Sequence, residues 1–315
     1  MTSKLLESMH PFAFSRYLID LPSELAITDE CRVTLTYGLG TDFETVDVEV
    51  LDPHADQAKL KTLVRNRSAK IASEQNEELK VSMLASTVAI SETAVMLRRF
   101  KSYLLTESFI CELYVLVGDA LVVAKASVYK NNIAPVEARL MKLLSQMSRP
   151  ADMSRAGKGF ALGPVLIDAG QDQEHSSITL HDAARPDVWF EISTNAIGAD
   201  PDQSLLQRGN ANDAKVRALG AKWDTLRRGK IRIANMDAEE ELIGYKAEGK
   251  TGFLFAAESQ RSQPSFDRQR LKFDLTSGSL IGGVPAESSL SKSEMLAIWT
   301  PAIKSVRLRP GALQQ

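Results

Sequence analysis

The chain has 315 residues, of which 44% are hydrophobic and 25% are charged, and its formal net charge is −2. This balance is typical of a soluble globular protein of about two domains, and the absence of a long basic stripe argues against nucleic acid as the main partner. No segment approaches the roughly 20 apolar residues that a membrane-spanning helix needs, so direct membrane insertion is not expected.

The first half of the chain predicts several strands and a helix. It begins with the apolar run FSRYLIDLP (14–22), which ends at a proline, and two runs of alternating apolar and polar residues follow at 32–38 and 45–52. Their period of two predicts strands, whereas residues 57–74 place their apolar residues on one helical face. Two further strand-like runs are KVSMLASTVAI (80–90) and MLRRFKSYLL (96–105).

The run YVLVGDALVVAKA (114–126) predicts a β-hairpin, because a Gly-Asp pair separates two Val- and Leu-rich segments. Gly118 would supply the positive φ of the turn. An amphipathic helix is predicted next over PVEARLMKLLSQMSRP (135–150), where Pro135 suits a first helical turn and Pro150 stops the helix.

The second half repeats this outline. It opens with GFALGPVLIDAG (159–170), which contains a second Leu-Ile-Asp segment, and two strands and a helical region over 202–208 and 212–228 follow. The last helix is predicted within 289–310, where Ser291 and Glu294 have the spacing of a capping box, Leu290 and Met295 that of a hydrophobic staple, and Pro301 should kink or end the helix early. The other strands are expected at 176–182, 187–194, 230–235, 240–247, 252–259 and 270–276.

These elements predict an α+β protein of two similar units, each an antiparallel sheet packed against helices. The predicted domains are residues 1–152 and 153–315, joined through the small and polar segment at 150–159. Both halves begin with a strand that contains Leu-Ile-Asp and end with a helix followed by Arg-Pro. This correspondence suggests that the chain arose by duplication.

The motifs of common enzymes are missing from the sequence, which contains no nucleophile elbow, phosphate-binding loop or dinucleotide-binding glycine pattern. No two of the four histidines are three or four residues apart, as a metal site on a helix requires. We therefore expect no catalytic residue, no cofactor and no metal. Cys31 and Cys111 lie in strand-like runs and are interpreted as buried free thiols, although a disulfide between neighbouring strands stays open.

Two charged segments of the second half are the candidate partner-binding sites. Trp223 is flanked by basic residues, among them Arg227 and Arg228, and is the best candidate for an exposed aromatic anchor, although the sequence favours burial over exposure. The acidic run DAEEE lies between two predicted strands, either as a solvated turn or as a negative loop that meets a basic patch on a partner. The candidate residues of this run are Asp237, Glu239, Glu240 and Glu241.

Several segments, in the same order along nearly the whole chain, resemble a known family. FSRYLIDLP is similar to the opening of immunity proteins that neutralise lipase effectors of type VI secretion, and the pattern SLSKSEMLAIWTPAIKSVRLRP (289–310) resembles their terminal helix. Three positions depart from the family: Ala13 and Ala161 stand where relatives often carry a pair of cysteines, and Ser15 replaces a glycine. The other similar segments are 135–150, 157–168, 204–208, 233–247 and 253–259.

The resemblance implies a two-domain, claw-like α+β protein without catalysis of its own. It would bind a lipase or phospholipase effector, block access to the active site of that enzyme, and act in the periplasm. The N-terminal residues lack the apolar centre of a signal peptide, so cytoplasmic action or a trimmed mature form stays open. The alternatives are a chaperone or adaptor that holds an effector for secretion, and an unrecognised hydrolase.

Overall fold

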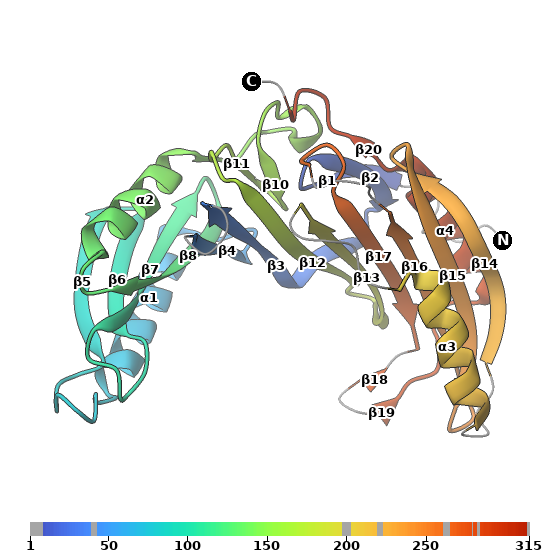
Figure 1. The fold of residues 1–315 in the computed structure, drawn as a ribbon, viewed down its shortest axis with the longest axis horizontal. Helices are drawn as coiled ribbons and strands as arrows, with labels where there is room; N and C mark the ends of the chain where they lie inside the picture. The colour runs from blue at the N-terminus through green and yellow to red at the C-terminus, as the bar shows by residue number, and fades with distance from the viewer. Residues whose placement is uncertain are drawn as a thin grey trace. The chain divides into compact units, whose positions relative to one another are not determined.

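The computed structural model describes residues 9–38, 43–196, 203–218, 223–260, 265–278, 280–281 and 284–313. Within these residues the chain is α+β, with four α-helices and antiparallel sheets, as predicted from the sequence (Figure 1). It divides into two compact units. Unit 1 comprises Met1–Glu30, Ser154–Lys158 and His175–Gln315, and unit 2 comprises Cys31–Met153 and Gly159–Glu174.

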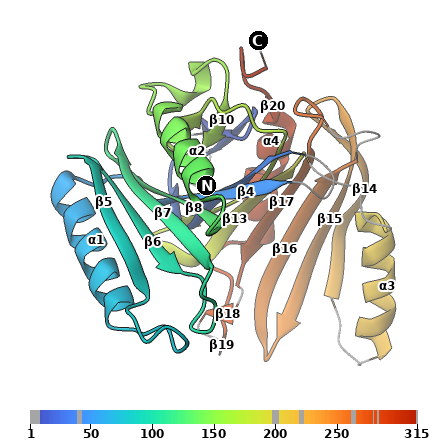
Figure 2. The ribbon, with the colours of Figure 1, turned by 60° about the vertical axis from the view of Figure 1, so that its left-hand side comes forward.

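The main sheet of unit 2 has the strand order β3-β4-β8-β7-β6-β5 and carries one helix on each face (Figure 2). Glu112 of β7 bonds to Arg67 of α1, whereas the next side chain along the strand, Cys111, lies 3.8 Å from Glu137 of α2. Because successive side chains of a strand point to opposite faces, α1 and α2 cover opposite faces. The elements are β3 (Leu25–Tyr37, which belongs to unit 2 from Cys31 onward), β4 (Glu44–Asp52), α1 (Gln57–Ala72), β5 (Leu84–Ser91), β6 (Ala94–Phe100), β7 (Ser108–Val117), β8 (Ala120–Tyr129) and α2 (Ile133–Ser145).

The local predictions for unit 2 are confirmed where the sequence pattern is strong. β7 and β8 form the expected hairpin, with Val117 paired to Ala120 and Gly118 at a φ of +62°. In α2, Val136, Leu140 and Leu143 are buried on the sheet. Cys31 and Cys111 are both free and buried, which confirms the interpretation as free thiols.

The main sheet of unit 1 has the strand order β12-β13-β17-β16-β15-β14. Its helices also cover opposite faces, since the neighbouring residues Glu239 and Glu240 of β15 bond to α3 and to α4, respectively. Two short strands, β18 (Leu280–Ile281) and β19 (Val284–Pro285), form a separate small ladder. The main elements are β12 (Gln173–Asp182), β13 (Arg185–Asn195), α3 (Leu205–Ala218), β14 (Trp223–Ile233), β15 (Met236–Ala247), β16 (Lys250–Ser259), β17 (Arg270–Ser277) and α4 (Lys292–Ser305).

The two main sheets share one topology. Along the chain, each contains two strands, a helix, four strands and a second helix, and the strands occupy the same places in both sheets. Both units also have a small three-stranded sheet built from a hairpin and a short strand that follows the last helix. This agreement, element by element, supports the duplication that the repeated outline of the sequence suggests.

In each small sheet, the hairpin comes from one half of the chain and the third strand comes from the other half. The hairpin of β1 (Met9–Phe14) and β2 (Tyr17–Pro22) pairs with β20 (Arg307–Leu308), at the opposite end of the sequence. The hairpin of β10 (Phe160–Leu162) and β11 (Val165–Ile167) pairs with β9 (Met147–Ser148), which belongs to the first half. Each compact unit therefore contains residues from both sides of the predicted boundary at 152/153. That boundary stays a prediction, namely of where the first repeat of the sequence ends and the second begins.

The two hairpins turn at corresponding residues with the same unusual backbone. Ser15 has a φ of +47° and Gly163 a φ of +56°. A side chain in this left-handed region costs roughly 1–2 kcal/mol, which glycine avoids. Ser15 replaces the glycine of the family pattern, and its buried hydroxyl donates a 2.7 Å hydrogen bond to Gln269 that offsets part of this cost.

The core of unit 1 contains a continuous series of aromatic rings that joins the first hairpin to α4. Tyr17 stacks on Phe14 at 5.8 Å, and Phe14 meets Phe273 edge-on at 5.7 Å. Phe273 contacts Phe190, which in turn lies 6.2 Å from Trp299. The segment FSRYLIDLP is thus a structural strand pair whose apolar residues are anchored in the core.

The start of α4 is confirmed in detail. Ser291 accepts a bond from the backbone of Glu294, and Glu294 accepts one from the backbone of Ser291. The staple residues Leu290 and Met295 are both buried. The expected early end of the helix is wrong, because α4 continues through Pro301 to Ser305; Pro301 is exposed.

Replacing Ser291 with alanine is expected to lower the free energy of unfolding of unit 1 by about 1 kcal/mol, since the backbone N–H of Glu294 loses its cap. Lys292→Ala, at the neighbouring exposed helical position, is the matched control and is expected to change it by less than half that amount. Urea unfolding followed by tryptophan fluorescence measures both. Equal losses in the two variants would contradict the role of the capping box.

Candidate functional site

The candidate residues of the sequence lie together on the hairpin of β14 and β15, which turns at Ala234 and Asn235 with φ angles of +49° and +64°. Two expectations about this segment are wrong. The predicted helix does not extend through Trp223 to Arg228, and Asp237–Glu241 is part of β15 and forms no loop. Oppositely charged residues face each other across the hairpin, and such cross-strand pairs favour strands. The pairs are Arg228 with Glu241, Lys230 with Glu239 and Arg232 with Asp237.

On one face of the hairpin, Glu240 forms a buried ion pair beneath α4. Its carboxylate lies 2.6 Å from Nε of Arg227 and accepts a 3.2 Å bond from the indole N–H of Trp299. Arg227 also donates to the hydroxyl of Thr300, 3.3 Å away. These contacts attach α4 to the strand and engage Arg227 and Glu240 within the chain.

On the opposite face, the charged side chains hold α3. The carboxylate of Glu239 accepts a 2.9 Å bond from the backbone N–H of Leu206, at the positive end of the helix dipole. Arg228 bridges Glu241 to Asp213 of α3, and the indole N–H of Trp223 donates to the same Asp213 at 2.8 Å. Gly209 makes this approach possible, because a side chain there would collide with the carboxylate of Glu241.

The structure therefore brings all seven candidate residues onto one hairpin and assigns six of them contacts that hold α3 and α4. Glu239, Glu240 and Glu241 are only 5–7% exposed. Asp237 differs, since its side chain is 82% exposed. Partner binding by the seven residues stays a prediction, and Asp237 is the one best placed to reach a partner directly.

A second candidate surface, which the sequence did not indicate, is an apolar patch on two loops of unit 2. Asn76 is fully buried and joins the loops, since its amide donates to the carbonyl of Leu105 at 3.0 Å and its oxygen accepts from the backbone N–H of Leu79 at 2.9 Å. The adjacent edge strand β5 carries no charged residue and exposes Val88. The patch residues are between 45% and 61% exposed: Leu79, Val81, Tyr103, Leu104 and Leu105.

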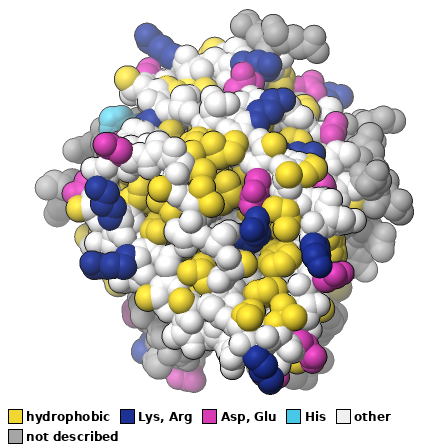
Figure 3. Space-filling view, turned by 90° about the vertical axis from the view of Figure 1, so that its left-hand side faces the viewer, with side chains coloured by type: hydrophobic (Ala, Val, Ile, Leu, Met, Phe, Trp, Pro, Cys, Tyr) yellow, Lys and Arg dark blue, Asp and Glu magenta, His cyan; other side chains and the backbone are white. Residues whose placement is uncertain are grey.

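Figure 3 views the side of unit 2 where β5 ends the sheet, and hydrophobic side chains gather there among Lys and Arg residues. Clusters of exposed apolar side chains are typical of surfaces that bind other proteins. The sequence predicts a strand over 96–105, but β6 ends at Phe100. Tyr103, Leu104 and Leu105 of the patch therefore lie in the loop after β6.

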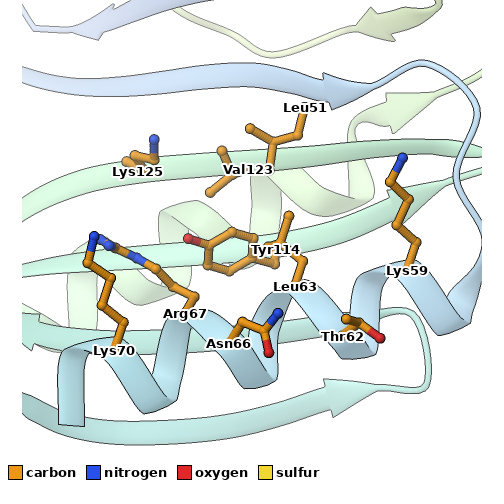
Figure 4. A pocket seen from close by; sticks show the side chains of 10 residues that line it. All are labelled: Leu51, Lys59, Thr62, Leu63, Asn66, Arg67, Lys70, Tyr114, Val123 and Lys125. Carbon is orange, nitrogen blue, oxygen red and sulfur yellow. The ribbon is translucent and has the colours of Figure 1, made fainter. Parts of the chain in front are cut away.

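A third candidate is a groove of about 710 Å³ between α1 and the sheet of unit 2 (Figure 4). Its side chains come from one face of α1 and from β4, β7 and β8. Pockets of this size accommodate small molecules or short peptide segments. The lining residues are Leu51, Lys59, Thr62, Leu63, Asn66, Arg67, Lys70, Tyr114, Val123 and Lys125.

The groove is supported by a buried carboxylate. Glu112 accepts bonds from Arg67 at 2.6 Å, Arg99 at 2.7 Å and the hydroxyl of Tyr114 at 2.7 Å. Burial disfavours the charged form of Glu112, but these bonds outweigh it and lower the pKa of the carboxyl to about 2. The side chain is thus ionised at neutral pH and fixes Arg67 and Tyr114 in the wall of the groove.

The described residues include no group of three or more His, Cys, Asp or Glu side chains that could hold a metal ion. Burial raises the pKa of the Cys111 thiol to about 12, so this thiol is protonated at neutral pH. Burial also raises the pKa of Cys31. No helix in the part of the chain that the structure describes is long and apolar enough to cross a membrane.

Residues 155–311 match the family of the Tle cognate immunity protein 4 C-terminal domain. These residues, in the C-terminal half of the chain, belong to this family of immunity-protein domains. The family consists of immunity proteins and not of enzymes, which confirms both the resemblance and the expectation that the chain is not an enzyme. No curated protein matches the chain.

Solved structures with this fold extend the likeness to the whole chain. The apo immunity protein TplEi of the type VI secretion system of Pseudomonas aeruginosa has a TM-score of 0.70 at 21% identity, over 96% of this chain and 98% of that one. A chain of the Tle4–Tli4 complex has a TM-score of 0.71 at 22% identity, over 97% and 99%. TplEi with an "L" peptide has a TM-score of 0.65 at 21% identity, over 96% and 99%. At these identities, the likeness establishes the fold.

Proposed function

We propose that this protein is an immunity protein that binds a cognate lipase effector of type VI secretion and inhibits it by blocking the entrance to its active site. The observation that carries the proposal is the family match of residues 155–311, joined to a fold shared over nearly the full chain with the immunity protein of the Tle4–Tli4 complex. We further propose that it acts in the periplasm, as the family resemblance implies.

The arrangement of each unit favours tight binding of a protein. Ion pairs and buried aromatic rings hold the helices on the sheets, so the surfaces are formed before a partner arrives and little conformational entropy is lost on association. Stable complexes bury about 1,200–2,000 Å² and depend on a few desolvated anchors. The apolar patch of unit 2 offers anchors such as Leu104, and the exposed Asp237 of unit 1 offers a charged contact at the rim.

Adding the purified protein to its cognate lipase is expected to abolish turnover at a one-to-one molar ratio. Titration of lipase activity against the concentration of this protein measures the stoichiometry. An active-site-directed covalent inhibitor tests the mechanism, because a blocked entrance slows labelling of the lipase nucleophile in the complex at least tenfold. A lipase with a different immunity partner is the control.

Binding of the lipase, its inhibition and the blocked entrance can each fail separately in these measurements. Undiminished turnover in a complex that forms would contradict immunity and favour an adaptor that holds the effector for secretion. Lost turnover with unchanged labelling would retain immunity but exclude a blocked entrance. Absence of binding to the cognate lipase would refute the function itself.

A further inference from the structure

Helix α1 carries an unusual concentration of positive charge. Its sixteen residues contain five basic side chains and no acidic one, although the whole chain has a net charge of −2. Asp56 caps its N-terminus, and the buried residues Leu60, Val64 and Ile71 attach it to the sheet. The basic residues are Lys59, Lys61, Arg65, Arg67 and Lys70.

One face of α1 forms the long wall of the groove. Six of its residues line the groove, from Lys59 to Lys70, and they recur at helical spacing (Figure 4). The eleven steps from Lys59 to Lys70 rise about 16 Å along the helix at 1.5 Å per residue. An extended polypeptide rises about 3.3 Å per residue, so the groove has the length of a segment of about five residues.

The groove presents positive charge around an apolar floor. Lys59, Arg67, Lys70 and Lys125 line it together with Leu51, Leu63, Val123 and Tyr114, and no carboxylate is among the lining residues. Lys59 and Lys125 pair with the nearby Asp52 and Glu49, and Arg67 pairs with Glu112. Among the described residues, Lys70 makes no ion pair, so its charge is available to a ligand.

We propose that this groove binds an extended acidic segment of the partner protein, with carboxylates beside Lys70 and Arg67 and an apolar side chain over Leu63. The inference rests on the proposed function in taking the lipase effector as the source of that segment. Charge complementarity favours an acidic partner, and the apolar floor favours a side chain such as leucine between the carboxylates. An elongated trough of this length fits a chain segment better than a compact small molecule.

The first experiment uses a fluorescent peptide and the intact protein. The probe is a Glu-Leu-Asp-Leu-Glu sequence flanked by Gly-Ser, compared with the same peptide in which lysine replaces each acidic residue. Binding is measured by fluorescence anisotropy in 150 mM salt, where the Debye length of about 8 Å screens distant charges. The acidic peptide is expected to bind at least tenfold more tightly than the basic one.

The matched variants are Lys70→Glu and Lys61→Glu, which make the same change of charge on exposed residues of the same helix. Only Lys70 lines the groove. Lys70→Glu is expected to weaken binding of the acidic peptide at least fivefold, and Lys61→Glu less than twofold. Equal effects of the two variants, or equal binding of the two peptides, would overturn the inference.

The same variants are then tested with the lipase. If the wild-type protein inhibits the lipase and Lys70→Glu weakens that complex more than Lys61→Glu, the effector is the source of the segment. If inhibition is intact in both variants, the groove inference fails and the proposed function stands. If the acidic peptide binds as expected but the lipase is neither bound nor inhibited, the proposed function fails and the effector is excluded as the source. Tighter binding of a single-stranded DNA of equal charge than of the acidic peptide would overturn the assignment to a protein segment.

Discussion

Replacing Trp299 with alanine is expected to lower the free energy of unfolding of unit 1 by about 3–5 kcal/mol, a large fraction of the 5–15 kcal/mol that stabilises a typical domain. Trp299 is fully buried and lies 5.9 Å from Phe255 and 6.2 Å from Phe190. Its removal leaves a cavity under α4 and takes a donor away from the buried carboxylate of Glu240.

The measurement is urea unfolding followed by the fluorescence of the remaining tryptophans, Trp189 and Trp223, which both belong to unit 1. Trp299→Phe is the matched variant, because it keeps an aromatic ring but loses the indole N–H. Trp299→Phe is expected to lose less free energy of unfolding than Trp299→Ala. The loss that remains in Trp299→Phe reflects the missing hydrogen bond to Glu240. A loss below 1 kcal/mol for Trp299→Ala would show that this tryptophan does not hold α4 on the sheet.

Replacing Glu112 with glutamine is expected to destabilise unit 2 by about 3 kcal/mol at neutral pH and to remove most of its sensitivity to acid. The variant leaves the guanidinium groups of Arg67 and Arg99 without their carboxylate, and breaking such a pair costs several kcal/mol. In the wild-type protein the folded pKa of Glu112 is about 2, against an ordinary value of 4.5. By 1.36 kcal/mol for each pKa unit, this difference corresponds to about 3 kcal/mol.

The sign of the pH dependence follows from the lowered pKa. The stabilisation by ionised Glu112 is fully present above about pH 4.5 and is lost as the pH falls toward 2, because the unfolded chain then binds the proton more readily. Hydrogen exchange of peptides from β7 measures the stability of unit 2 between pH 2 and 6. The wild-type protein should lose protection in this range, and Glu112→Gln should change little.

Glu107→Gln is the matched control for this experiment. Glu107 also pairs with a basic residue of unit 2, Lys130, but both side chains are 70% exposed and lie 3.4 Å apart. Exposed pairs contribute little, so this variant is expected to keep the stability and the pH dependence of the wild-type protein. If Glu112→Gln behaved like Glu107→Gln, the buried network would have no energetic role.

The sequence was a good guide wherever local chemistry decides the structure. The turn after β7 requires a positive φ, which Gly118 provides, and the cap of α4 is made by Ser291 and Glu294. The apolar residues of α2 recur at helical spacing and are buried on the sheet. Each of these features depends on residues within a few positions of one another. The segments of α2 and α4 were also part of the resemblance that the family match confirms.

The hairpin of β14 and β15 illustrates why other predictions failed. A run such as Asp237–Glu241 is interpreted as a solvated turn when only its own charges are considered. In the folded protein, Arg227 and Arg228 on the neighbouring strand pair with Glu240 and Glu241. On the covering helices, the backbone N–H of Leu206 and the indole N–H of Trp299 donate to Glu239 and Glu240. Burial of Glu239, Glu240 and Glu241 is therefore a consequence of partners that are distant in sequence.

The sequence also did not predict the apolar patch or the groove of unit 2. Leu79 and Leu104 belong to different loops, which the buried amide of Asn76 and the backbone bond from Glu77 to Tyr103 join. The basic residues of α1 become one wall of a groove only when Tyr114 and Lys125 of the sheet supply the other. Surfaces of this kind are made by side chains from several elements, and no local pattern encodes their proximity.

By itself, the sequence determined the α+β class, the repeated outline, the local turns and caps, and the family, because each follows from periodicity, from backbone preferences or from ordered motifs. Tertiary structure alone decided that the two hairpins change places between the halves, that the acidic run is buried, and that α1 lines a basic groove. The physical reason is that strand pairing and ion pairing between distant residues depend on which surfaces meet after folding, and that information is not local.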